Sequence, residues 1–168
     1  MDMSTISETD IDQLAASQLN AINQRYTKNR RQLIEILLET SKPITINQIL
    51  ESNQKLAQSS VYRNLAVLEQ AGLVVKIITN DDHAHYELAE HILDHHHHII
   101  CSPCGEILDF HLSEKIEKAL ESSLKEIADD FGFSIDRHRL DLLGTCGECT
   151  SLLYTSDAAD DQASGEEG

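Results

Sequence analysis

The chain has 168 residues, of which 40% are hydrophobic, and its 29 acidic residues outweigh 13 lysines and arginines to give a net charge of −16. This length and apolar content allow one or two small cores, as in a soluble globular protein. No apolar run approaches the roughly 18 residues of a membrane span, and the acidic start has no basic segment of a signal peptide, so we expect a cytoplasmic protein with no membrane partner.

The charge is distributed unevenly along the chain. Residues 21–76 contain eight lysines and arginines against four acids, a local balance of +4, whereas residues 77–150 hold most of the acidic side chains. A basic segment suits phosphate binding, which the overall charge would disfavour. The acidity of the remainder fits either a domain that binds cations or a generally acidic proteome.

Helices are predicted throughout the first 72 residues. Apolar residues recur at helical spacing over 14–26 and again over 33–38. Thr45 can cap a third helix that continues through Leu50. Ser59 or Ser60 can cap a fourth helix, which Gly72 would end.

Strands are predicted next. Two β-prone runs, 73–79 and 83–89, are separated by a turn signal at residues 80–82. Helices followed directly by a hairpin are typical of a winged helix. Beyond a link at 90–94, we expect strands at 95–101 and 106–110, a helix over 116–131 that ends at Gly132, and a final strand over 133–143.

The predicted organisation is therefore an α+β protein in four segments. Residues 1–89 form the winged-helix domain, 90–94 a hinge, and 95–153 a second small domain. The small, acidic residues of 154–168 show no periodicity, and we expect a disordered tail there.

All four cysteines occur in two C-x-x-C pairs, Cys101 with Cys104 and Cys146 with Cys149, each with a glycine placed to let the chain turn, at Gly105 or Gly147. Two such pairs complete the tetrahedral sulfur site that zinc prefers. Disulfides are disfavoured without a secretory signal, and buried core cysteines would not be expected in this spacing. The pattern indicates a closed, structural zinc site.

All nine histidines lie between His83 and His138, and four are consecutive, His95 to His98. On a strand, successive side chains point to opposite faces, so His95 and His97 face one way while His96 and His98 face the other. This geometry supplies two ligand pairs for two metals.

Further ligands are ambiguous from the residues alone. His138 can be a ligand or a hydrogen-bonded core residue, and Glu121 can be a ligand or a solvated carboxylate. On the hairpin, His83, His85 and Glu87 share one strand face, which can be a metal site or a polar solvent face. Mixed imidazole and carboxylate sites suit zinc, ferrous iron, manganese or nickel.

The motifs SSVYRNLAVLEQAGLV, HAHYELA, HHHHIICSPCGEILDF and HRLDLLGTCGEC, in this order, resemble the ferric uptake regulator (Fur) family from about Arg25 to Cys149. The resemblance implies that the second domain is a small α/β dimerisation domain with a four-cysteine zinc site. It also implies a regulator rather than an enzyme: a metal-dependent repressor of metal uptake and homeostasis genes, with Zn²⁺ or Fe²⁺, or else Mn²⁺ or Ni²⁺, as co-repressor.

The resemblance also assigns the ligands. The structural zinc falls on Cys101, Cys104, Cys146 and Cys149. One sensing site falls on His95, His97, Glu121 and His138. The second falls on Glu87, His96 and His98, with His83 or His85 replacing a histidine that the family often places near residues 42–43.

By similarity, the exposed face of the fourth helix carries the residues that read DNA: Ser60, Tyr62, Arg63 and Asn64. Arg63 can contact guanine through two hydrogen bonds, and the Tyr62 ring can pack on thymine methyls. Basic residues near the second helix would contact phosphates or the minor groove, unless they form a solvated helix face: Arg25, Lys28, Arg30 and Arg31. So short a reading surface favours a homodimer on a palindromic double-stranded operator.

In this interpretation, wing residues and the dimerisation strand share a metal that favours the DNA-competent arrangement. Three alternatives stay open. A peroxide-sensing repressor of the same family would use an aspartate at Asp109. A metal-buffering protein would explain the histidines but not the basic helices, and a zinc hydrolase would need an open metal position beside a general base. We expect no small organic substrate.

Overall fold

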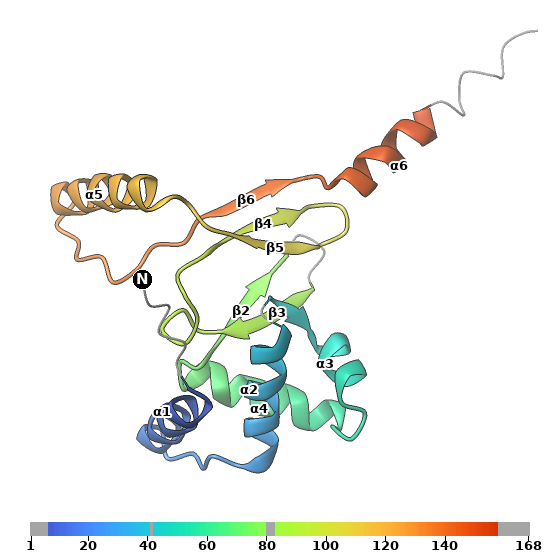
Figure 1. Ribbon diagram of the computed structural model, residues 1–168, viewed down its shortest axis with the longest axis vertical. Coiled ribbons are helices and arrows are strands. Elements are labelled where there is room, and N and C mark those ends of the chain that lie inside the picture. Colours follow the sequence, from blue (N-terminus) through green and yellow to red (C-terminus); the bar gives the residue numbers. More distant parts are fainter. Residues whose placement is uncertain (1–6, 41, 80–82, 158–168) are drawn as a thin grey trace, which may run out of the picture.

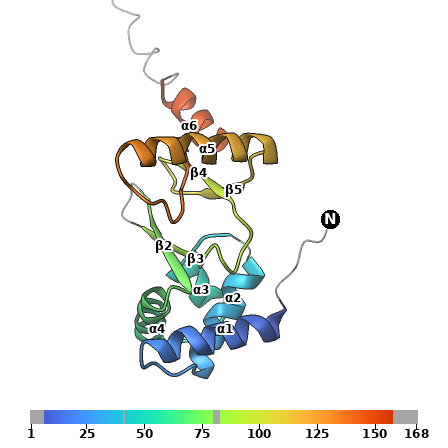
Figure 2. The ribbon, with the colours of Figure 1, turned by 90° about the vertical axis from the view of Figure 1, so that its left-hand side faces the viewer.

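The computed structural model describes residues 7–40, 42–79 and 83–157. Its N-terminal part contains α1 (Glu8–Ala21), α2 (Lys28–Thr40), β1 (Ile44–Thr45), α3 (Ile46–Ser52), α4 (Gln58–Gln70), β2 (Val74–Ile78) and β3 (Ala84–Leu88). Its C-terminal part contains β4 (His97–Cys101), β5 (Ile107–Phe110), α5 (Glu114–Asp130), β6 (Asp141–Gly144) and α6 (Gly147–Asp157). The two parts lie at opposite ends of the molecule (Figures 1 and 2). The predicted α+β fold class is confirmed.

The helix starts follow local capping chemistry. Thr45 caps α3 as predicted, because its hydroxyl accepts from the Gln48 amide while the Gln48 side chain accepts from the Thr45 amide. The prediction for α4 was wrong, since Ala57 occupies the cap position without a side-chain bond. The first helix ends before the predicted Tyr26, because Asn23 turns the chain with a φ of 58°.

The predicted hairpin is confirmed, and it forms one edge of a three-stranded antiparallel sheet in the order β1-β3-β2. Val74 pairs with Leu88 at its open end and Ile78 with Ala84 near the turn. The turn itself, residues 80–82, lies outside the described residues. Buried side chains from all four N-terminal helices and from this sheet form the main core, including Leu19, Leu37, Ile49, Leu65, Leu68 and Leu88. Gly72 follows α4 with a φ of +74°, as expected of a glycine that ends a helix.

The second sheet has the order β5-β4-β6, with β4 antiparallel to β5 and parallel to β6. The predicted final strand over 133–143 was too long, because only residues 141–144 pair with β4. The segment after α5 therefore crosses to β6 as irregular chain. In the described residues, no helix is both long enough and apolar enough to cross a membrane.

Helix α6 was not predicted from the sequence. It extends through Asp157, so residues 154–157 are helical where a disordered tail was expected. The consecutive apolar residues Leu152 and Leu153 gave no helical spacing from which to predict it. Residues 158–168, the rest of the expected tail, lie outside the described residues.

Candidate metal centres and nucleic-acid interface

The four cysteines meet at the end of the second sheet. Cys101 ends β4, Cys104 lies in the following turn, and Cys146 and Cys149 flank the start of α6. Parallel pairing of Cys101 with Gly144 brings the two C-x-x-C pairs together. All four sulfur atoms lie within 4.8 Å of one another, and none is in a disulfide. Gly105 turns the chain with a φ of +72°, as expected, whereas Gly147 begins a helix.

The acid–base properties of these thiols fit a bound cation. Backbone N–H groups of Cys146 and Cys104 lower the pKa of Cys101 to about 6. The neighbouring Cys146 thiol raises the pKa of Cys149 to about 12, so the last proton is hard to remove from the cluster. A cation stabilises the deprotonated set, as zinc does in closed four-thiolate sites.

The first histidine cluster consists of His95, His97, Glu117 and His138, whose ligand atoms lie within 4.8 Å of one another. The Nε2 atoms of all three histidines lie 3.0 Å from an oxygen of Glu117. His97 is only 1% exposed. Three imidazole nitrogens and one carboxylate converging in this way form a donor set that divalent transition metals accept.

Glu117, rather than Glu121, supplies the carboxylate of this cluster. The two glutamates are one turn apart on α5, so both lie on the same side of the helix. Glu121 is exposed and lines the adjoining pocket beside His95 and His138. Which of the two glutamates meets the histidines depends on where α5 lies along β4, and the lengths of the segments on either side of α5 fix that position. The helical spacing of apolar residues does not determine it.

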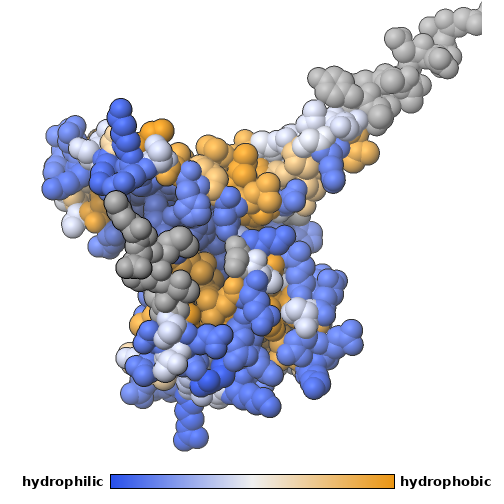
Figure 3. Space-filling model, viewed as in Figure 1, coloured by the Kyte–Doolittle hydropathy of each residue, from blue (hydrophilic) through white to orange (hydrophobic). Residues whose placement is uncertain are grey.

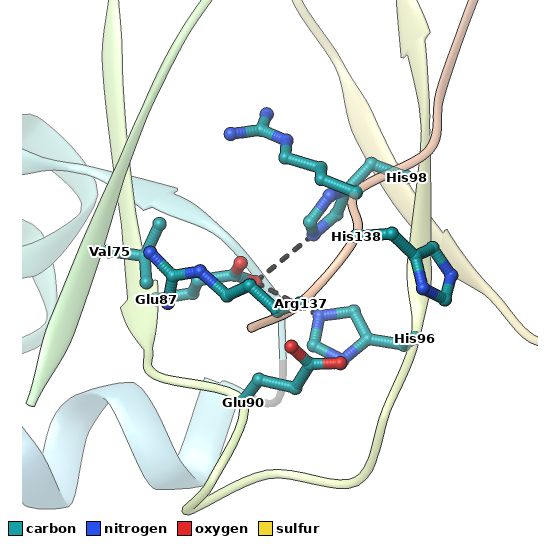
Figure 4. A pocket seen from close by; sticks show the side chains of 8 residues that line it. Val75, Glu87, Glu90, His96, His98, Arg137 and His138 are labelled. Carbon is teal, nitrogen blue, oxygen red and sulfur yellow. Dashed lines mark hydrogen bonds and ion pairs between the residues drawn. The ribbon is translucent and has the colours of Figure 1, made fainter. Parts of the chain in front are cut away.

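The second histidine cluster consists of Glu87, His96, His98 and Asp109, also within 4.8 Å of one another. The Nε2 atoms of His96 and His98 each lie 3.2 Å from Oε2 of Glu87. Figure 4 marks both contacts with dashed lines. The Nε2 atom of His98 lies 3.8 Å from Oδ1 of Asp109. Glu87 comes from β3 of the N-terminal part, whereas the other three come from β4, its approach and β5. The cluster therefore joins the two parts of the chain.

The second histidine cluster holds opposite charges in partly buried surroundings. Burial would raise the pKa of Glu87, but hydrogen bonds from His96 and His98 hold it at about 2. The hydrogen bond to Glu87 raises the pKa of His96 to about 9. Burial raises the pKa of Asp109. Glu87 thus stays an anion, and a cation that binds here displaces the proton of His96.

The surface of α4 presents two of its predicted DNA-reading residues outward. Tyr62 is 54% exposed, and Arg63 is also exposed. Asn64 and Ser60 are half-buried and bonded to each other, since Nδ2 of Asn64 donates to the backbone oxygen and the hydroxyl of Ser60. Of the four predicted DNA-reading residues, Tyr62 and Arg63 are therefore the two with exposed side chains.

The predicted phosphate contacts fall into two groups. Arg25 and Lys28 are exposed. Arg30 is only 9% exposed, and its guanidinium donates to Asn64, Gln24 and the backbone oxygen of Arg25. It is therefore engaged within the protein instead of facing a phosphate. Arg31 bonds Asp12 of α1.

The sequence profile of the ferric uptake regulator family matches residues 21–143. This chain belongs to the ferric uptake regulator family. Its Fur relatives include the ferric uptake regulation protein of Campylobacter jejuni, 31% identical over 133 residues that cover 76% of this chain and 80% of the relative. The peroxide-responsive repressor PerR of Staphylococcus saprophyticus is 24% identical over 152 residues, covering 88% and 96%.

Solved Fur structures share the fold. The Helicobacter pylori ferric uptake regulator Fur, described with three functional metal binding sites, matches with a TM-score of 0.69 and 24% identity over 88% of this chain and 97% of that one. The Pseudomonas aeruginosa regulator, solved with manganese, matches with a TM-score of 0.64 and 25% identity over 79% and 98%. These Fur relatives are metal-responsive transcription regulators, not enzymes, so the hydrolase alternative is excluded.

The Fur resemblance left one ligand of the second site open, and the structure brings Asp109 there rather than His83 or His85. These two histidines line a separate pocket beside Lys42 and Glu106. His85 lies two residues along β3 from Glu87, on the side away from residues 90–94. Asp109 was predicted only for a peroxide-sensing Fur protein. Its spacing of 11 residues from His98 across a β4–β5 hairpin was the available signal, since His98 and Asp109 are register partners.

Proposed function

We propose that this chain is a metal-dependent transcriptional repressor of metal uptake and homeostasis genes, acting in the cytoplasm as a homodimer on a palindromic operator. The observation that carries the proposal is the second histidine cluster, because Glu87 lies on the wing while His96, His98 and Asp109 lie beyond the hinge. These four residues would hold a divalent regulatory ion, Zn²⁺ or Fe²⁺ or else Mn²⁺ or Ni²⁺, with the first histidine cluster as a second such site and the four cysteines holding structural zinc. A bound ion supplies positive charge shared by ligands of both parts.

The ligands explain how such an ion would favour DNA binding. Glu87 and His98 are less than 9% exposed and come from opposite sides of the hinge. An ion bound by both side chains would therefore restrict the angle between the wing and the second sheet. In a dimer, that angle sets the separation of the two α4 helices. A ligand shifts such an equilibrium only by its differential affinity for the two arrangements. Ligands drawn from both parts provide that difference.

An open apolar face supports the homodimer. Ile99 of β4 pairs in register with Leu108 of β5 on one side and with Leu142 of β6 on the other. Their exposed fractions are 42%, 50% and 44%. Figure 3 shows apolar surface over these strands. A row of three apolar side chains across a sheet is suited to burial against a second copy.

Fluorescence anisotropy with an inverted-repeat DNA from the protein's own promoter region tests the proposal. The titration is run in metal buffers of zinc, ferrous iron, manganese and nickel, with wild type and a His96→Ala, His98→Ala variant. We expect one ion to tighten wild-type binding and to have no effect on the variant. Equal binding by metal-free and metal-loaded wild type would contradict the proposal.

A peroxide-sensing repressor is the second candidate, favoured by Asp109 in the second histidine cluster. The same anisotropy assay separates the two. A peroxide sensor should lose its operator affinity when the iron-loaded protein is exposed to hydrogen peroxide, and it should keep that affinity when loaded with manganese. A metal-uptake repressor should show the same operator affinity after peroxide exposure whether it is loaded with iron or with manganese.

A further inference from the structure

Asp141 lies next to the second histidine cluster, on the side of His98 that faces away from Glu87. It is the first residue of β6, and parallel pairing makes it the register partner of His98 on β4. Its Oδ1 atom lies 3.3 Å from Nδ1 of His98. The carboxylate therefore contacts the nitrogen of His98 that does not face the ligand atoms of the cluster.

The two nitrogens of His98 thus have different partners. Its Nε2 atom faces Glu87 at 3.2 Å and Asp109 at 3.8 Å, on the side where a cation would be held. An imidazole that offers Nε2 to a cation carries its proton on Nδ1, and that proton needs an acceptor. His98 is only 4% exposed, so Asp141 replaces water as that acceptor.

Arg139 holds Asp141 in place. Its Nε donates to Oδ1 of Asp141 at 3.0 Å, and its Nη2 lies 2.7 Å from Oδ2. Two parallel bonds of this kind fix the plane of a carboxylate. The guanidinium also balances the charge of Asp141, which therefore acts as an oriented acceptor and not as a further anionic ligand.

The other histidine of the cluster is oriented differently. Nδ1 of His96 lies 2.8 Å from the backbone oxygen of Asp94, an acceptor that no substitution removes. Of the two histidines in this cluster, His98 is the one whose Nδ1 meets a side-chain acceptor. This difference makes the contribution of Asp141 measurable by mutation.

We propose that Asp141 is a positioning residue of the second histidine cluster, holding His98 with its proton on Nδ1 and its Nε2 directed at the cation. The inference rests on the proposed function, since it concerns the same site. Loss of such an outer partner typically weakens metal binding by about 10–100-fold. We expect a loss in that range for Asp141→Leu and a smaller loss for Asp141→Asn, which keeps an acceptor oxygen.

The experiment uses the full chain with zinc at the cysteines and the first histidine cluster disabled by His97→Ala and Glu117→Ala. Co²⁺ is titrated against a competing chelator, and its visible absorption reports the ligand set. Asp130→Asn is the matched control, because it removes one exposed carboxylate from the end of α5. The thermal midpoint of each zinc-loaded variant reports folding, and the ¹⁵N shift of His98 Nδ1 in the Zn²⁺-loaded protein reports its proton.

The expected result is weaker Co²⁺ binding in both Asp141 variants, unchanged binding in Asp130→Asn, and an altered His98 Nδ1 signal in Asp141→Asn. A dissociation constant for Asp141→Leu within about twofold of the parent would overturn the inference alone, as would an equal loss in Asp130→Asn. Failure of the parent itself to bind Co²⁺ would overturn the proposed function and this inference together.

Discussion

The Nε–H of Arg30 donates a hydrogen bond to Oδ1 of Asn64 at 3.1 Å, and this bond joins α2 to the middle of α4. The Asn64 amide continues the connection by donating to Ser60 in the first turn of the same helix. Three residues predicted to contact DNA, Arg30, Asn64 and Ser60, are thus bonded to one another and fix α4 against α2. Tyr62 and Arg63 lie between Ser60 and Asn64 in the sequence and face outward. Their orientation therefore depends on how these bonds hold α4.

Replacing Arg30 should therefore cost stability. Arg30→Ala removes charged hydrogen bonds to Asn64, Gln24 and the backbone of Arg25. We expect the free energy of unfolding of the zinc-loaded protein to fall by about 2–4 kcal/mol in urea denaturation. Arg25→Ala removes an exposed guanidinium of the same charge and should stay within about 0.5 kcal/mol of wild type. Equal losses in the two variants would contradict a structural role for Arg30.

Replacing Arg63 should affect specificity instead of stability. Arg63→Ala is expected to weaken operator binding by about 1–3 kcal/mol, because a bidentate contact to guanine is lost. Anisotropy with operator and with unrelated DNA measures the effect. Lys28→Ala should weaken binding to both DNAs alike, as a phosphate contact does. If Arg63→Ala also weakened both alike, Arg63 would be a phosphate contact too.

Tyr26 should make stability depend on alkaline pH. Its hydroxyl donates to Asp12 at 2.6 Å, and burial together with this bond raises the pKa of Tyr26 above its ordinary value. Above about pH 10 the unfolded chain loses a phenolic proton that the folded protein retains, so the free energy of unfolding falls as pH rises. Tyr26→Phe lacks this dependence and should be about 1 kcal/mol less stable at neutral pH. Denaturation at pH 8 and 11 should show that difference shrinking; a constant difference would exclude the linkage.

Glu117 and Glu121 offer a matched pair for the first histidine cluster. Glu117→Gln removes the carboxylate that contacts three histidines and should weaken metal binding there by about 100-fold or more. Loss of a residue that only hydrogen-bonds a ligand typically weakens binding by about 10–100-fold. Glu121→Gln makes the same chemical change one turn away and should leave the affinity unchanged. Calorimetric titration with Mn²⁺ distinguishes the two glutamates, and the reverse outcome would restore the assignment made from the sequence.

Zinc removal should unfold the end of the second sheet. The cysteines connect β4 with α6, and structural zinc contributes on the order of 10 kcal/mol in small zinc domains. Cys146→Ser should therefore lose bound zinc and part of its far-ultraviolet circular dichroism. Ser102→Ala, in the turn between Cys101 and Cys104, should keep both. Full zinc content in Cys146→Ser would show that the cluster is not the structural site.

The sequence predicted features that follow from local geometry. The alternation of His95 to His98 between two clusters holds. His97 and His98 lie on β4, where successive side chains point to opposite faces, and His95 and His96 continue the alternation just before the strand. The hairpin and the Thr45 cap were correct for similar reasons, since their chemistry lies within a few neighbouring residues.

Features set by distant partners could not be predicted. The strand over 133–143 has β-prone residues, but only its last part reaches β4, and His138 consequently lies in irregular chain. The sequence does not distinguish Arg30 from the other basic residues of α2, because its partners Asn64 and Gln24 lie outside that helix. The choice between Glu117 and Glu121 depended likewise on how α5 meets β4.

The approach to β4 and the strand itself supply ligands to all three candidate centres within seven consecutive residues, from His95 to Cys101. Inserting one residue between His96 and His97 would turn His95 and His96 each toward the other histidine cluster, while His97 and His98 stay fixed by the pairing of β4. Substitutions, by contrast, alter one centre at a time. A replaced side chain therefore changes the donor set of one cluster alone, whereas a change of length in this segment is expected to change both histidine clusters at once.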